Sequence, residues 1–225
     1  EEMSMKKIIK YIISIFKTIY FNFRVLDYKT AIKMPIFIAY NTKVSIKQTR
    51  SVFIQSDKIT FAMIKIGFGG TDFLSTNRSI FEVKKDAKII FKGKAFFSEG
   101  IAISLDEGAT LIIGENFSCN KNCLFYANKN ICFGNDVLLG WSVTIRDNDG
   151  HVIFQNGQEK QNAKGINIGS NVWIASNVDI LKGVIVKENS IIATRSCVTK
   201  SFDKSNILIG GYPAKIIGEN VSWKK

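Results

Sequence analysis

The sequence predicts an all-β chain that folds as a parallel β-helix, and a repeat of six residues is the main observation. From residue 168 onward the chain can be written as IGSNVW, IASNVD, ILKGVI, VKENSI and IATRSC. The first column of this alignment is aliphatic without exception: Ile168, Ile174, Ile180, Val186, Ile192 and Val198. The chain has only 2 prolines, Pro35 and Pro213, and both lie outside the repeats. A period of six differs from the 3.6-residue period of a helix and is typical of a hexapeptide solenoid.

The physical basis of the repeat is a triangular coil. Each hexapeptide forms one short strand and a turn, three hexapeptides complete a coil, and successive coils stack at the strand spacing of roughly 4.8 Å. The aliphatic first residue points into the prism, and a small residue beside it fits the tight corner. Because every interior strand is paired on both sides, proline is excluded from the body of the solenoid.

The repeat continues upstream with a looser register. The first column extends through Phe133, Leu139 and Ile145 and, after a slip of two residues, through Ile113, Cys119 and Phe125. We therefore place the solenoid at residues 42–200. Residues 145 and 168 are 23 apart, five more than one coil of 18, which indicates an inserted loop at 146–165. This loop contains the only histidine of the chain, His151.

Residues 1–41 are expected to form an N-terminal amphipathic helical arm. One helix face is apolar and is interrupted by Lys6, Lys10 and Lys17; it comprises Ile9, Ile12, Ile13, Phe16 and Ile19. The first 50 residues contain ten basic and three acidic residues, so they carry +7 of the net charge of +12. The arm is too short and too charged to span a bilayer. Two interpretations stay open, and both can hold: it docks on an anionic membrane surface or a membrane-bound partner, or it caps the solenoid.

Composition excludes several classes of function. A chain of 225 residues with 46% hydrophobic residues can bury a sizeable core, which excludes intrinsic disorder. A single histidine excludes a three-histidine metal site. The four cysteines form no Cys-x-x-Cys pair, so we expect free thiols in a reducing cytoplasm and no metal. The positive charge would suit a nucleic acid, but no recognised motif supports that partner.

An ordered set of segments carries a family resemblance over most of the chain. These segments are GWSVTIRDNDGH, INIGSNVWIASNVDILKGVIV, SIIATRSCVTKSF and GGYPAKIIGENVSW. Together they resemble the left-handed parallel β-helix acyltransferases, the hexapeptide family that includes serine, maltose and galactoside acetyltransferases. Within it, they are most similar to sugar O-acetyltransferases of polysaccharide, capsule and lipopolysaccharide biosynthesis. The resemblance implies a left-handed coil, a homotrimer, acetyl-coenzyme A as the acyl donor and a sugar acceptor.

The inserted loop contains the candidate catalytic residues. Acyl transfer from a thioester to a hydroxyl needs a base that later returns the proton, and one imidazole can do both. His151 is the only such group, and its place matches the catalytic histidine of the family. Asp147 or Asp149 could orient the imidazole; we favour Asp149, although both aspartates could instead be turn-forming residues. Asn120 aligns with a family asparagine that contacts the donor or the substrate, or it is a corner residue in a left-handed conformation.

The donor-binding residues are carried over from the family. Trp173 matches an aromatic residue beside the active site, unless it packs between subunits. The other matching positions are Ser176, Thr194, Thr199 and Lys200 along the coenzyme A arm, and Pro213 and Lys215 in a C-terminal donor-binding loop and tail at 201–225. Gly218 stands where a second basic residue is expected, which weakens the expected phosphate site.

Two alternative functions stay open. The acceptor could be an amino sugar, as in nucleotide-sugar N-acetyltransferases, but those relatives commonly carry an α/β domain and no Gly-rich βαβ segment occurs here. The chain could also be a non-catalytic solenoid scaffold with a membrane-binding arm. The expected location is the cytoplasm, with peripheral contact at the inner face of the membrane if the arm docks there.

Overall fold

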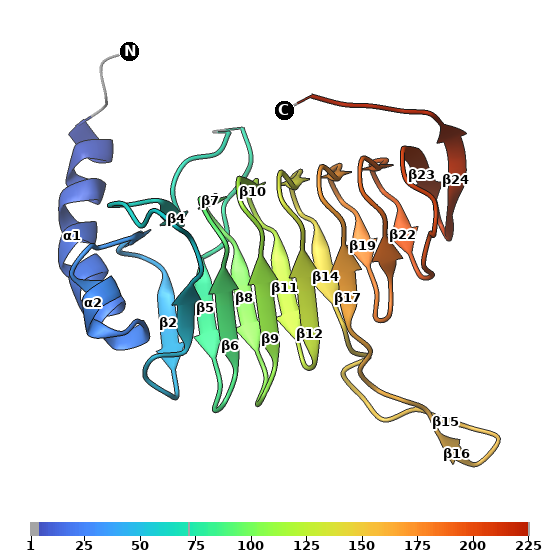
Figure 1. Ribbon diagram of the computed structural model, residues 1–225, viewed down its shortest axis with the longest axis horizontal. Coiled ribbons are helices and arrows are strands. Elements are labelled where there is room, and N and C mark those ends of the chain that lie inside the picture. The colour runs from blue at the N-terminus through green and yellow to red at the C-terminus, as the bar shows by residue number, and fades with distance from the viewer. Residues whose placement is uncertain (1–4, 72, 225) are drawn as a thin grey trace.

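The computed structural model describes residues 5–71 and 73–224, which form a stack of short strands with a helix at one end (Figure 1). The chain visits three parallel sheets in turn, once per coil, as the six-residue period predicts. Sheet A consists of β1 (Ile36–Ile38), β4 (Ile64–Ile66), β7 (Ala95–Phe97), β10 (Phe117–Cys119), β13 (Leu138–Leu139), β18 (Trp173–Ile174), β21 (Ile191–Ile192), β23 (Ile207–Gly211) and β24 (Ala214–Glu219).

The other two sheets complete the triangular prism. Sheet B consists of β2 (Lys43–Ile46), β5 (Ile80–Val83), β8 (Ala102–Leu105), β11 (Leu124–Ala127), β14 (Thr144–Arg146), β19 (Asp179–Ile180) and β22 (Cys197–Val198). Sheet C consists of β3 (Val52–Ile54), β6 (Lys88–Phe91), β9 (Thr110–Ile113), β12 (Asn130–Phe133), β17 (Ile166–Ile168) and β20 (Ile185–Val186). We call the turns that join these sheets the A–B, B–C and C–A corners.

The predicted first column forms the core of the prism. All twelve of its named residues, from Ile113 to Val198, are at most 1% exposed. The earlier coils are filled by phenylalanine: Phe97, Phe117, Phe125 and Phe133 contact one another in edge-on or tilted pairs, with ring centroids 5.0–6.2 Å apart. Large aromatic side chains in the column explain why the sequence register was looser there.

Both ends of the solenoid differ from the predicted boundaries. β1 pairs with β4 in parallel, Ile36 with Ile64, so the sheets begin directly after Pro35 and not at residue 42. At the other end, β23 pairs in parallel with β21, and β24 turns back antiparallel to β23. Much of the segment 201–225, expected as a loop and tail, therefore extends sheet A, because a hairpin can continue the sheet where the hexapeptide repeat stops.

The inserted segment leaves the solenoid as a hairpin between β14 and β17. Its two strands, β15 (Phe154–Gln155) and β16 (Gln158–Glu159), are antiparallel. Figure 1 shows this hairpin projecting away from the stack. His151 therefore lies where the chain departs from the solenoid, at a B–C corner.

Helix α1 (Met5–Val25), followed by the short α2 (Tyr28–Ala31), covers the open edge of β1. Asn22 donates from Nδ2 to the carbonyl of Ile36 (2.7 Å) and accepts from its amide (3.1 Å). Thr18 accepts from the amide of Ile38 (3.1 Å), and Ser14 from that of Tyr40 (3.0 Å). An edge strand leaves these backbone groups unpaired, and the helix supplies their partners. The structure thus shows the capping interpretation of the arm.

The apolar face of α1 is exposed to solvent. Phe16 is 77% exposed and Ile12 54%, and the rest of the predicted apolar face is also exposed. Lys10 pairs with Glu99, and Lys17 donates to the carbonyl oxygens of Tyr40 and Thr42, so both lysines turn toward the protein. Among the described residues, no helix has both the length and the apolar character needed to cross a bilayer.

Candidate active site

A groove of about 610 Å³ runs along the outer face of sheet A and its A–B corner, near the C-terminal end of the solenoid. Four predicted site residues line it: Asn120, Trp173, Ser176 and Thr194. The side-chain nitrogen of Asn120 donates to the carbonyl of Leu139 (3.1 Å), which fixes its orientation. The groove also contains all three tryptophans of the chain, since Trp141 and Trp223 join Trp173 in its lining.

Small residues on consecutive coils leave room for this groove. Gly140, Ala175 and Ala193 follow the buried core residues of three stacked strands. A Cβ atom on Gly140 would lie 2.7 Å from the backbone nitrogen of Ser176, so only glycine allows these coils to approach this closely. The hydroxyl of Ser176 accepts from the amide of Trp141 (3.0 Å), and the hydroxyl of Thr194 donates to the carbonyl of Ser176 (2.7 Å). These bonds tie the corner into a ladder.

Asp147 anchors the base of the hairpin that contains His151. Its buried carboxylate accepts from the amides of Asn128 (2.7 Å) and Lys129 (2.8 Å) on the preceding coil. Both oxygens are therefore committed to the backbone. These bonds fit the turn-forming alternative for Asp147, and an orienting role for it stays a prediction.

Asp149 ties the same hairpin to the following coil. Its carboxylate pairs with Lys182, which also donates to the carbonyl of Gln161 (2.6 Å). The imidazole of His151 is exposed to solvent, and within the described chain it has no hydrogen bond to either aspartate. An orienting role for Asp149 stays a prediction.

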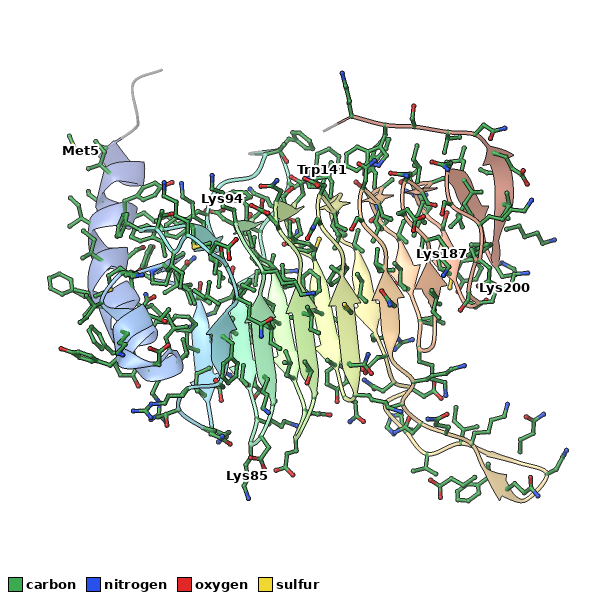
Figure 2. The ribbon with its side chains drawn as sticks, in the orientation of Figure 1. Met5, Lys85, Lys94, Trp141, Lys187 and Lys200 are labelled. Atoms are coloured by element: carbon green, nitrogen blue, oxygen red, sulfur yellow. The ribbon has the colours of Figure 1, made fainter. Side chains whose placement is uncertain are left out.

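The groove and His151 lie at opposite ends of the strands of sheet B. Trp141 precedes β14 at the A–B corner, and His151 follows β14 at the B–C corner. Thr199 and Lys200 follow β22 at the B–C corner, so they do not line the groove with Ser176 and Thr194. Figure 2 shows Trp141 and Lys200 on different edges of the prism. Pro213 and Lys215 are exposed on the β23–β24 hairpin, also outside the groove lining.

Comparisons with known proteins show that the chain is similar to several acetyltransferases. No family model matches the chain. It is 34% identical over 115 residues to a galactoside O-acetyltransferase from Escherichia coli K12, covering 50% of this chain and 55% of the relative. It is 33% identical over 122 residues to a polysialic acid O-acetyltransferase from Escherichia coli O1:K1, covering 53% and 39%. The chain thus spans about half the length of the curated relatives it matches.

A solved structure extends the match over most of the chain. The crystal structure of the polySia specific acetyltransferase NeuO is similar with a TM-score of 0.54 and 29% identity, covering 82% of this chain and 89% of that chain. The chain is similar to hexapeptide-repeat acetyltransferases, in agreement with the resemblance of its sequence. The left-handed parallel β-helix predicted from the sequence is confirmed as the fold class of the chain.

The family resemblance did not point to three residues of the groove, Trp141, Trp223 and Lys224. Trp141 lies at a corner of the repeat, one coil before Ser176, and its amide donates to the hydroxyl of that residue. The six-residue register could therefore have placed Trp141 next to the predicted residue Ser176. Trp223 and Lys224 follow the last repeat, where no periodicity predicts their position.

The four cysteines are free thiols, and three of them are buried. Cys119 and Cys123 are buried in the core. Burial raises the pKa of the Cys119 thiol well above its usual value, and burial also raises the pKa of Cys132. A thiol that stays protonated is a poor nucleophile and a poor metal ligand. In the described part of the chain, no three His, Cys, Asp or Glu side chains are grouped so that they could hold a metal ion.

Proposed function

We propose that the chain is an acetyl-coenzyme A dependent O-acetyltransferase that modifies a sugar hydroxyl of a cell-surface polysaccharide, capsule or lipopolysaccharide precursor. One observation carries the proposal: the single histidine is exposed at the base of the hairpin that projects from the solenoid, with both adjacent aspartates engaged in holding that base. Two relatives are named as O-acetyltransferases of galactosides and of polysialic acid, and these names support the reaction class and the kind of acceptor.

His151 performs the proton transfers of this reaction. Its imidazole accepts the proton of the sugar hydroxyl while the sugar oxygen attacks the thioester carbonyl carbon. As the carbon–sulfur bond breaks, the imidazolium returns the proton to the leaving thiolate, so the products are the acetylated sugar and free coenzyme A. Backbone amides at the corner stabilise the oxyanion formed between these steps.

The groove suits the acyl donor. Its floor is made of glycine, alanine and short hydroxyl side chains, and its volume of about 610 Å³ falls within the usual range of small-molecule sites. Ser176 and Thr194 present hydroxyl groups to the long, amide-rich arm of the donor, and Trp173 provides an aromatic wall near the reacting end.

We infer that the active site forms between two chains of a homotrimer. His151 and the groove lie at opposite ends of the strands of sheet B, so one chain alone keeps the base away from the donor. In a cyclic trimer, each interface brings one corner of a chain against a different corner of its neighbour. Such an interface can place His151 of one protomer at the groove of the next.

Replacement of the histidine tests the proposed function. We expect His151→Ala to lower the rate of coenzyme A release with a competent oligosaccharide acceptor by about 10²–10⁴-fold, while coenzyme A still binds. Gln158→Ala, at the exposed tip of the same hairpin, is the matched control and should stay within about twofold of the unmodified protein. Full activity of His151→Ala would refute the assignment, and a preference for amino sugars in the same assay would favour the N-acetyltransferase.

We also propose that the outward face of α1 makes peripheral contact with a membrane. The face is apolar, and Tyr28 of α2 extends it through a ring contact with Phe23 (5.8 Å). Lys29 of α2 and the nearby Lys33 are exposed, and the first 50 residues carry +7 of the net charge. An exposed apolar helix face bordered by lysines is typical of helices that lie in the membrane interface.

Sedimentation with vesicles tests this contact. Because Lys10 and Lys17 are turned toward the protein, we expect binding by apolar insertion that persists at high salt. Phe16→Asp should lower the fraction of protein bound to vesicles that contain phosphatidylserine by about tenfold. Phe16→Leu is the control and should bind normally. Equal binding by Phe16→Asp, or a change in oligomer size without loss of vesicle binding, would reject the contact.

A further inference from the structure

The last described residues of the chain return along the solenoid and reach the groove. After β24 the segment 220–224 runs back over the edge of the stack (Figure 1). The amide of Val221 donates to the carbonyl of Asn206 (3.0 Å). The indole nitrogen of Trp223 donates to the carbonyl of Asn171 (2.8 Å), which positions the ring beside Trp173 with the ring centroids 6.1 Å apart and the planes at 41°.

This return adds two kinds of chemistry to the groove. Trp223 is half-buried and supplies an aromatic surface that faces the same space as Trp173. Lys224 also lines the groove and is exposed, so its ammonium group lies at the open side. Apart from these two residues, the described lining is apolar or contains only uncharged polar groups.

We propose that Trp223 and Lys224 are donor-binding residues, an inference that rests on the proposed function. Coenzyme A has an arm with a dimethyl-substituted carbon and two amides, and it carries phosphates at the nucleotide end. The indole of Trp223 packs against the apolar part of the arm, and Lys224 pairs with a phosphate. Lys224 is the one cation in the described lining of the groove, because Lys215 on β24 lies outside it.

The segment can be changed without disturbing the core. Trp223 is held by one hydrogen bond and one ring contact, and its neighbours Ser222 and Lys224 are exposed. The strands of the neighbouring coils pair with one another and not with residues 220–224. The one backbone hydrogen bond from this segment is that of the Val221 amide to Asn206. An effect of Trp223 on ligand affinity can therefore be separated from an effect on folding.

Calorimetric titration with coenzyme A tests the proposal on the full chain. We expect Trp223→Ala to weaken binding by about tenfold, and Trp223→Phe, which keeps an aromatic ring, by no more than about threefold. Lys224→Ala should weaken binding by about threefold at low salt, and this loss should vanish near 0.5 M salt, where charges are screened within about 4 Å. Ser222→Ala, in the same segment, should bind like the unmodified protein.

The outcomes separate this inference from the proposed function. If the unmodified protein binds coenzyme A and Trp223→Ala binds it equally well, Trp223 is not a donor-binding residue and the proposed function stands. If the unmodified protein does not bind coenzyme A, both fail. A loss of affinity in Trp223→Ala that is matched by a lower Tm would assign the residue a structural role and overturn the inference, as would a salt-independent effect of Lys224→Ala for its phosphate contact.

Discussion

At the scale of single residues, two aspartates beside the histidine have different tasks. Asp147 is fully buried, and its two oxygens satisfy the amides of Asn128 and Lys129. Asp149 is partly exposed and pairs with Lys182. The first aspartate links the hairpin base to the preceding coil, and the second links it to the following coil. His151 is thus held from both sides by backbone that its neighbours fix.

Replacement of these aspartates separates the two tasks. We expect Asp147→Asn to lower the free energy of unfolding by about 2 kcal/mol, because an NH₂ group would face a buried backbone amide. Asp149→Asn removes a partly exposed ion pair and should cost less than about 1 kcal/mol. Urea unfolding at a fixed protein concentration measures both values. Equal losses in the two variants would contradict the different roles that their burial indicates.

At the scale of elements, polar and charged side chains on or just after β5, β8 and β11 contact one another, and they make the stability of the solenoid depend on pH. Asp106 follows β8 and contacts Lys84, Asn128 and the hydroxyl of Tyr126 (2.9 Å). Burial alone would raise the pKa of Asp106, but hydrogen bonds from Lys84, Asn128 and Tyr126 outweigh it and hold the pKa below its usual value. The hydrogen bond to Asp106, together with burial, raises the pKa of the Tyr126 phenol.

These shifts predict opposite losses at the two ends of the pH scale. The depressed pKa of Asp106 stabilises the fold above the unfolded-state pKa of a carboxyl, and this contribution disappears as pH falls through the folded-state value. The raised pKa of Tyr126 stabilises below the unfolded-state pKa of a phenol and is lost as pH rises through the folded-state value. The stability difference between the unmodified protein and Asp106→Asn should therefore be largest near neutral pH and shrink toward acid. A difference that is constant with pH would contradict the role of the carboxylate charge.

Helix α1 shows what periodicity can predict and what it cannot. The spacing of Ile9, Ile12 and Phe16 predicted a helix with one apolar face, and that helix is present. The direction of the face was not predictable, because the unpaired edge of β1 selects the polar side through Ser14, Thr18 and Asn22. The hexapeptide column was predictable because each first-position residue is buried for the same reason. Trp223 was not, because its position depends on a return of the chain after the repeat ends.

At the scale of the whole molecule, the triangular prism separates the two halves of the candidate site. The groove occupies the A–B corner and His151 the B–C corner, at opposite ends of β14. The hairpin after His151 has exposed Val152, Ile153 and Phe154, which form an apolar surface that a neighbouring chain could cover. The geometry of one chain therefore favours a site that is completed by a second one.

Complementation between two inactive variants tests this arrangement. His151→Ala lacks the base, and Thr194→Trp places a large side chain at an exposed position of the groove, so each homotrimer should be inactive.

In randomly mixed trimers, an interface is competent when one chain supplies His151 and the next supplies an open groove. With equal amounts of the two variants, each of the two chains at an interface is the required variant in half of the cases. About one quarter of the interfaces of a cyclic trimer should therefore be competent. We therefore expect co-refolded or co-expressed variants to recover about a quarter of the activity of the unmodified protein, measured as coenzyme A release. A site contained within one chain would recover no activity, because every chain carries one of the two substitutions, and that result would reject the shared site.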